Sequence, residues 1–353
     1  MKISFPNSHL FYIIESRIAS DKYSGLSHVA EHALLIPTDI GKAFRAKGYT
    51  CINHVFLSFS SPQLTVLQEI DNLIMSGNIV TEEIVNIAKE QVMWEIADTS
   101  HKTAISMQIQ CFVTDDRIAS HAVGETDEVK KIQTADILEW LNQKIQSGQV
   151  HRYLFNSSDE IVEATQYAPR TSHLQELEIQ QQDDGSPKTL FIVSLDKTKT
   201  VRMYFRIPSL LSKMDVFQKG FVEYCIQRKL LSTLEIDADI YDKFFDVNER
   251  YVLVEFAWDP SKRPYGAISS ALSQMNNISD EEFLLFRSDF LKLLSQLVPQ
   301  SESAYQRINA IKNEIVYAYP HIKPDDFCLI ERINYSSFLE CKKLYGPVKI
   351  VFL

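Results

Sequence analysis

The segment from Gly25 to Leu35 constrains this chain most, because its sequence GLSHVAEHALL sets two histidines four residues apart. In a helix, residues four apart lie on one face, one turn above each other. His28 and His32 can therefore direct both imidazoles to one metal ion, and zinc accepts neutral histidine nitrogen readily. Glu31 precedes the second histidine, where its carboxylate can take a proton from a water molecule beside the metal. The pattern predicts a helix at about 24–36 that carries a zinc site.

The alternative is a helix with two solvated histidines and a glutamate, because five residues can match by chance in a chain with nine histidines. The flanking sequence favours the zinc site. Gly48-Tyr49-Thr50-Cys51-Ile52-Asn53 leads into an alternating run, His54 to Ser60. His121-Ala122-Val123-Gly124-Glu125 precedes an expected helix from Thr134 to Ile145. With the order H-x-x-E-H, which inverts H-E-x-x-H, residues 20–157 resemble the pitrilysin/insulinase family of zinc peptidases.

This resemblance implies an α+β fold with two duplicated domains, each a mainly antiparallel sheet packed with helices. It also implies a third zinc ligand on a helix at 81–98, where the match is Glu95. Glu95 follows His32 by 63 residues (95 − 32 = 63), and an apolar run before it suits a carboxylate that faces an interior site. Glu90 and Asp98 are the alternative ligands, and an ordinary solvated glutamate is the alternative reading of Glu95.

The resemblance further implies that an edge strand near Asn53 to Phe59 holds an extended peptide, with Asn53 and His54 as substrate contacts. His54 can equally be a plain strand-face residue. In the second half, Tyr241 stands where the family has a tyrosine that binds substrate, although a packing role is the alternative. The family's arginine seven residues earlier is replaced by Leu234, and its supporting acid seven residues before the ligand glutamate is replaced by Ala88.

The chain is expected to divide into a zinc-bearing domain at 1–165, a polar linker at 166–188, and a second domain at 189–353 without the metal motif. The expected strands are 9–19, 50–60, 150–155, 189–195, 201–207, 239–246, 250–258 and 348–352. The expected helices are 24–36, 64–76, 81–98, 102–114, 134–147, 213–235, 262–276, 279–297 and 301–316.

The two halves end alike, which indicates an internal duplication. Ile132 to Glu139 and Ile333 to Glu340 have similar sequences, and each is followed by a helix and a strand. Thr134 and Ser336 are expected to cap these two helices, because short hydroxyl side chains accept hydrogen bonds from the first helical turn. A chance recurrence of helix and strand at a domain end is the alternative.

Composition excludes several function classes. Lys and Arg total 36 against 46 Asp and Glu, and the net charge of −10 with no basic stripe argues against nucleic acid as the partner. The net charge is compatible with cationic or neutral peptides. No apolar run approaches the roughly 18 residues that a membrane span needs. Five widely spaced cysteines predict no disulfide framework, and the N-terminus does not read as a signal peptide. A cytoplasmic location is therefore expected.

The function expected from the motif and the resemblance is that of a zinc-dependent endopeptidase subunit. It would cleave leader or precursor peptides, as subunits that mature bacteriocins do, together with a second homologous subunit that supplies the missing arginine; a homodimer is the other possibility. One alternative is a catalytically weak or silent subunit that binds peptide. Another is an oligomeric scaffold of the same fold, which normally loses H-x-x-E-H.

Overall fold

The structure is a computed structural model of residues 1–353, and it describes residues 7–16, 21–36, 44–50, 54–98, 124–165, 189–193, 200–205, 213–234, 247–248, 251–257, 277–297, 303–317, 323–343 and 348–352. The chain forms two compact units, one of residues 1–170 with 302–316 and one of 171–301 with 317–353. The first unit is thus discontinuous, whereas the sequence suggested two contiguous domains. The expected elements at 102–114, 166–188, 239–246 and 262–276 lie outside the described residues.

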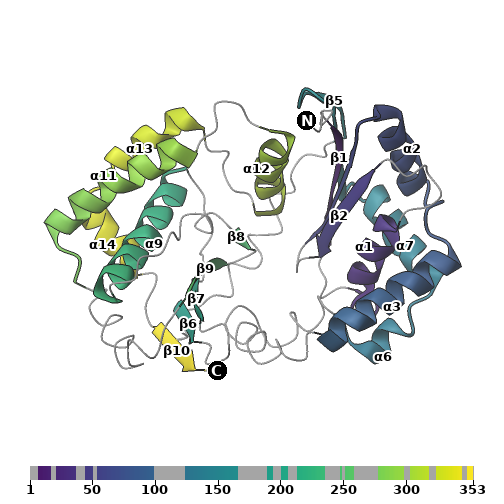
Figure 1. The fold of residues 1–353 in the computed structure, drawn as a ribbon, viewed down its shortest axis with the longest axis horizontal. Helices are drawn as coiled ribbons and strands as arrows, with labels where there is room; N and C mark the ends of the chain where they lie inside the picture. Colours follow the sequence, from purple (N-terminus) through teal and green to yellow (C-terminus); the bar gives the residue numbers. More distant parts are fainter. Residues whose placement is uncertain are drawn as a thin grey trace, which may run out of the picture. The chain divides into compact units, whose positions relative to one another are not determined.

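The first unit is built on a five-stranded antiparallel sheet of order β2-β3-β1-β4-β5. Its strands are β1 (Ser8–Glu15), β2 (Arg45–Thr50), β3 (His54–Ser61), β4 (Val150–Phe155) and β5 (Ile161–Thr165). Its helices are α1 (Leu26–Leu35), α2 (Leu64–Met75), α3 (Glu82–Asp98), α6 (Thr126–Val129), α7 (Thr134–Gln146) and α12 (Ala304–Tyr317). Helices α1, α2, α3 and α7 lie on one side of this sheet (Figure 1).

Alternation along the strands gives the sheet two faces. Leu10, Tyr12 and Ile14 of β1 join the core under the helices, with Val55, Leu57 and Phe59 of β3. The other face is also buried, and it carries Phe11, Ile13, Phe56, Tyr153 and Phe155. Helix α12 packs against this second face. Its Tyr305 meets the rings of His9 and Phe11 at 5.1 and 5.0 Å and shares a 2.9 Å hydrogen bond with the Ser58 hydroxyl.

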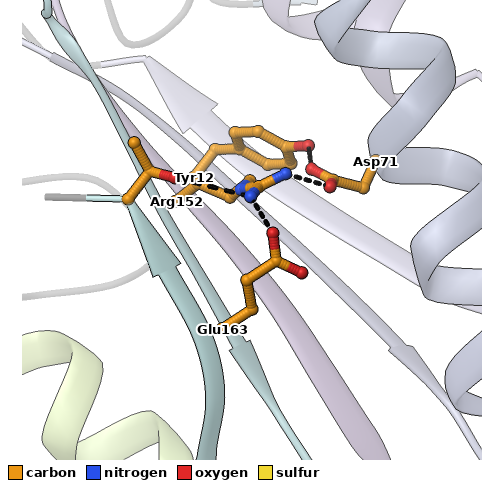
Figure 2. Close-up of polar contacts among 5 residues, drawn as sticks. Tyr12, Asp71, Arg152 and Glu163 are labelled. Atoms are coloured by element: carbon orange, nitrogen blue, oxygen red, sulfur yellow. Dashed lines mark hydrogen bonds and ion pairs between the residues drawn. The ribbon is translucent and has the colours of Figure 1, made fainter.

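A buried polar network joins α2 to the sheet (Figure 2). The Asp71 carboxylate of α2 accepts hydrogen bonds from the Tyr12 hydroxyl and from the Arg152 guanidinium. Arg152 also pairs with Glu163 of β5 and lies 3.4 Å from the Thr165 hydroxyl. Because Asp71 is 6% exposed, removal of its partners would leave a buried charge uncompensated. The network therefore fixes α2 and the edge strand β5 to the centre of the sheet.

The second unit has a five-stranded sheet of order β10-β6-β7-β9-β8. Its strands are β6 (Thr189–Val193), β7 (Thr200–Phe205), β8 (Val247–Asn248), β9 (Tyr251–Ala257) and β10 (Val348–Phe352). Its helices are α9 (Lys213–Leu234), α11 (Asp280–Leu297), the 3-10 turn η4 (Pro324–Phe327), α13 (Cys328–Glu331) and α14 (Tyr335–Lys343). Phe221 of α9 is fully buried and packs on Phe283, Phe290 and Phe338.

The expected α+β fold of two similar domains is confirmed, with one difference between the sheets. Strand β4 follows α7 and pairs with β1, whereas β10 follows α14 and pairs in parallel with β6, which lies between β10 and β7. Gln133, not Thr134, is the N-cap residue of α7, and its backbone amide donates a 2.8 Å hydrogen bond to the Asp136 carboxylate. Likewise Asn334, not Ser336, accepts the Ser337 amide at 2.9 Å. The two caps occupy matching positions in the two repeats.

Two strands differ from the sequence expectation. Residues 45–49, which lay outside the expected strands, form most of β2, and residues 161–165 form β5 next to the expected linker. Strand β3 pairs with β1 on one side and β2 on the other. The expectation of an edge strand near Asn53 to Phe59 is therefore wrong for its described part, because β3 is internal and β2 is the edge among the described strands. Across the part of the chain that is described, no helix is long and apolar enough to cross a membrane.

Candidate metal centre

The N-terminus of α1 is fixed by two contacts that orient the whole helix. The Asp21 carboxylate accepts hydrogen bonds from the Ser27 amide at 2.9 Å and from its hydroxyl at 3.0 Å, which satisfies first-turn donors. Gly25, with φ of +89°, lies against Gly124, and an added Cβ on Gly25 would meet the Gly124 Cα at 2.9 Å. Only glycine tolerates this backbone conformation at such close approach. The motif helix is thus locked to the segment that begins at Gly124.

Three side chains from two helices meet at one point. His28 and His32 of α1 lie with ring centroids 4.9 Å apart. The Glu95 carboxylate of α3 reaches both rings, with one oxygen 3.2 Å from Nε2 of His28 and the other 3.4 Å from Nε2 of His32. The ligand atoms of His28, His32 and Glu31 also lie within 4.8 Å of one another. The structure therefore brings all four sequence-predicted residues together.

The spacing of these donors fits a zinc ion. Zinc binds histidine nitrogen and carboxylate oxygen at roughly 2.0–2.1 Å, so a tetrahedral angle places two ligand atoms about 3.3 Å apart. The two Nε2–carboxylate distances, 3.2 and 3.4 Å, match this separation. Two histidines and one glutamate are also a donor set of catalytic zinc sites, which keep one position open. The residues present therefore suit zinc in both chemistry and spacing.

Glu31 lies beside the histidines and is held by the edge strand β2. The Thr50 hydroxyl donates a 2.7 Å hydrogen bond to one carboxylate oxygen of Glu31. The other oxygen lies over Gly48, where an added Cβ would stand 2.8 Å from it and 2.6 Å from Leu35 Cδ1. Burial raises the pKa of Glu31, while the Thr50 hydrogen bond and the nearby histidines oppose that rise. The carboxylate is therefore enclosed and held in one orientation.

Gln91 supplies support that the sequence analysis did not identify. Its side-chain oxygen lies 2.9 Å from Nδ1 of His32. A hydrogen bond at one ring nitrogen sets the tautomer and leaves the other nitrogen for a metal. Ala88, at the family's supporting-acid position, is fully buried and offers no donor or acceptor side chain. Gln91, one helical turn before Glu95, orients His32 instead.

The structure separates Glu95 from the alternative ligands. Glu90 is exposed on α3 and lines a shallow depression with Glu83 and Ile87, away from the histidines. The side chain of Asp98 lies outside the described residues. The apolar run before Glu95 does not face the interior as a whole, because Trp94 within it is 77% exposed. The evidence for Glu95 as the ligand is therefore its contact with both histidines, not the apolar residues that precede it.

Of the three predicted substrate contacts, only His54 lies within the described residues. Asn53 and Tyr241 lie outside the described residues, and Leu234 is the last residue of α9. His54 lies on the α12 face of the sheet, opposite Glu15 in the strand register, and it is fully buried. That face is turned away from α1, so the structure does not bring His54 to the metal centre.

Thr50, Gln91 and Gly48 are the site residues that sequence reasoning missed. Gln91 carried a usable signal, because it lies four residues before Glu95 and hence on the same helix face. Thr50 and Gly48 are two residues apart and therefore lie on the same face of β2. This pattern could be used only if residues 45–50 were recognised as a strand, and the Gly and Lys residues of this segment are poor strand formers.

Solved structures with the same fold include peptidase-like proteins and a chain of Complex III2 from Candida albicans. The periplasmic protease PqqL from Escherichia coli matches with a TM-score of 0.66 at 13% identity, over 98% of this chain and 45% of PqqL. A peptidase M16 inactive domain from Pseudomonas fluorescens matches with a TM-score of 0.65 at 10% identity, over 99% of this chain and 93% of that one. A protease from Helicobacter pylori matches with a TM-score of 0.58 at 12% identity, over 100% and 95%.

No family model matches the sequence, and no curated protein matches it. Identities of 10–13% establish the fold alone. The matched structures include proteases and a domain described as inactive, so activity has to be argued from the residues of the site. On the structural matches, this chain has the fold of the M16, or pitrilysin-like, peptidase domains.

Proposed function

We propose that this chain is a zinc-dependent endopeptidase subunit in which His28, His32 and Glu95 hold the metal. The observation that carries the proposal is the position of the Glu95 carboxylate, whose two oxygens lie 3.2 and 3.4 Å from the two histidine Nε2 atoms. Glu95 is half-exposed, yet its carboxylate contacts both metal-binding nitrogens at once. Zinc bound there would polarise a peptide carbonyl and acidify a neighbouring water.

Glu31 is the general base in this proposal. It is buried, it lies within the same cluster, and Thr50 holds one of its oxygens at 2.7 Å. A carboxylate in this place can accept the proton of the attacking water and pass it to the leaving amine. Gln91 acts on His32 and keeps its Nε2 directed at the centre.

The substrate in this proposal is an extended peptide that pairs with the free edge of β2. Among the described strands, β2 pairs only with β3, so its other edge presents backbone donors and acceptors. Thr50 and Gly48 bring this edge against Glu31. Backbone pairing tolerates many sequences, as cleavage of leader or precursor peptides, including bacteriocin precursors, requires. Asn53 and Tyr241 are proposed as further contacts through the family resemblance.

A second pitrilysin-like subunit is proposed to complete the active site. Leu234 and Ala88 replace the arginine and the acid that the resemblance leads one to expect. Loss of one oxyanion donor typically slows a reaction by about 10²–10³. The chain alone should therefore cleave fluorogenic peptides poorly, and a homologous subunit with an Arg/Tyr pair should raise the rate and elute with it as a dimer. Full activity of the isolated chain would contradict the need for a partner.

The second candidate is a silent, peptide-binding subunit. It is favoured by the match to a domain described as inactive and by the replacement of the arginine at Leu234. It predicts peptide binding without cleavage under every pairing of subunits.

Zinc content and cleavage together test the proposal. Purified full-length protein made with zinc should carry about one zinc per chain by elemental analysis, and His28→Ala or His32→Ala should lose it, because a three-ligand site cannot spare a histidine. His173→Ala, which alters a histidine outside the motif, is the control for nonspecific binding. Protein without zinc would refute the metal site, and zinc-loaded protein that never cleaves with any partner would favour the silent subunit.

A further inference from the structure

The edge strand beside the metal centre carries a local charge opposite to that of the whole chain. Arg45, Lys47 and Tyr49 alternate along β2 and are exposed, whereas Ala46, Gly48 and Thr50 are partly buried. Gly48 and Thr50 face Glu31 of α1. Tyr49 instead stacks on Phe56 with ring centroids 5.1 Å apart. The alternation of a strand therefore places Arg45, Lys47 and Tyr49 on the face away from α1.

A third cation lies at the Thr50 end of the same face. Lys312 of α12 donates a 2.8 Å hydrogen bond to the Tyr49 hydroxyl, and its ammonium lies over the Tyr49 and Phe56 rings at 5.4 and 5.9 Å. Neither β2 nor β3 contains an acidic residue. Arg45 and Lys47 form no ion pair with any other residue in the described ranges. The face is therefore a row of three cations, and among the described residues Arg45 and Lys47 have no acidic partner.

A peptide strand paired with β2 would place every second side chain on this face. Residues directly opposite on neighbouring strands have Cβ atoms roughly 4.5–5.5 Å apart, and opposite charges there attract. The net charge of −10 acts from farther away, and salt screens charges beyond about 8 Å at physiological ionic strength. The attraction of an acidic peptide to the nearby cations should therefore exceed its repulsion by the net negative charge of the chain.

We propose that β2 selects substrate peptides with acidic side chains at positions two residues apart, opposite Arg45 and Lys47. The proposal rests on the proposed function for the place of the peptide, and it adds the substrate class. It differs from the cationic or neutral peptides with which the net charge of the whole chain is compatible.

Peptide binding to full-length protein carrying Glu31→Gln tests the selection without cleavage. Fluorescent peptides of equal length would carry glutamate at every second position, the same number of glutamates in adjacent pairs separated by two neutral residues, lysine at every second position, or no charge. Fluorescence anisotropy would be recorded with and without zinc, at low and high salt. Alternating glutamate should bind about three- to tenfold more tightly than the neutral peptide. Adjacent pairs should gain less, because half of their charges face away from the cations.

The second test reverses the charges of Arg45 and Lys47. Arg45→Glu with Lys47→Glu should shift the preference to alternating lysine, whereas Lys130→Glu, an exposed lysine of the α6 turn, should leave it unchanged. Equal affinity for the two glutamate spacings, no effect of the reversal, or no peptide binding at all would overturn the inference. Cleavage of the neutral peptide by the unmodified chain, alone and with a partner, reports separately on the proposed function. Cleavage without a preference for acidic peptides would contradict only the proposed selection by β2. A preference for acidic peptides without cleavage would contradict only the proposed peptidase activity.

Discussion

The side-chain oxygen of Gln91 lies 2.9 Å from Nδ1 of His32, while Nε2 of the same ring lies 3.4 Å from Glu95. Both partners come from α3, one helical turn apart, so a single helix orients His32 from both nitrogens. Gln91 thereby takes the supporting role that Ala88 cannot perform.

Gln91→Ala should weaken zinc binding about 10- to 100-fold, because the imidazole loses the partner that sets its tautomer and orientation. The measurement is competition for zinc with a chelator of known affinity. Glu90→Ala, at the neighbouring exposed position, is the matched control and should bind zinc as the unmodified chain does. Unchanged affinity in Gln91→Ala would show that the contact is incidental.

Two variants, Glu31→Gln and Glu95→Gln, should distinguish the general base from the metal ligand. Glu31→Gln should keep zinc and the fold but lower peptide cleavage by about two or more orders of magnitude, since only proton transfer is removed. Glu95→Gln should lower zinc content, because a neutral amide is a poorer zinc ligand than a carboxylate. Zinc stoichiometry and cleavage rate are measured on both variants with the same partner subunit. The reverse pattern would exchange the two roles.

Gly48→Ala should impair cleavage more than it impairs zinc binding. The added Cβ would stand 2.6 Å from Leu35 Cδ1, 2.8 Å from a Glu31 oxygen and 3.0 Å from the Phe56 carbonyl oxygen, so Glu31 has to shift. Displacement of a catalytic group by about 1 Å can cost about a hundredfold in rate. Lys47→Ala on the other face of β2 is the control for uncharged peptides, and thermal unfolding checks the fold. Unchanged cleavage by Gly48→Ala would show that catalysis tolerates the shift of Glu31 that the added Cβ imposes.

Stability should fall in acid because of His54. Burial, and secondarily the charge of Lys312, lowers the pKa of His54 from 6.5 to about 3. Between these values the unfolded chain binds a proton that the folded chain excludes. The free energy of unfolding should therefore decrease as pH falls from about 6.5 towards 3, by up to about 1.4 kcal/mol per pH unit from this group. His54→Gln should flatten that slope in urea unfolding, and an unchanged slope would contradict the assignment.

Tyr305 should hold α12 to the sheet of the first unit. Its ring lies 5.0 Å from that of Phe11, and its hydroxyl lies 2.9 Å from that of Ser58. Tyr305→Phe should cost about 1 kcal/mol through the lost hydrogen bond, and Tyr305→Ala should cost about 2 kcal/mol, less than the loss of a core aromatic ring because Tyr305 is 40% exposed. Asn309→Ala, exposed on the same helix, should change stability little. Denaturant unfolding measures all three, and a neutral Tyr305→Ala would show that α12 is held elsewhere.

The sequence by itself determined which residues form the core of the candidate metal centre, because their arrangement follows from local spacing. His28, Glu31 and His32 occupy one helical turn, so their proximity follows from helix geometry before any packing is known. The sequence also predicted α2 at 64–76 and β4 at 150–155, which the structure places at Leu64–Met75 and Val150–Phe155. Glu95 came from the family resemblance, and its contacts with the two histidines came from the structure.

Only the tertiary structure decided which groups surround that centre, because those contacts join segments without a local pattern. Thr50 reaches Glu31 only when residues 45–50 form the edge strand β2, a segment whose pairing with β3 overrides its weak strand propensity. His54 alternates onto the face opposite α1, since a shift of one residue along a strand changes the face. Helix α12 joins the first unit from far along the chain, through contacts such as Tyr305 with Ser58, 247 residues apart. No periodicity in a sequence specifies such a partner, because long-range packing selects it among many surfaces of similar hydrophobicity.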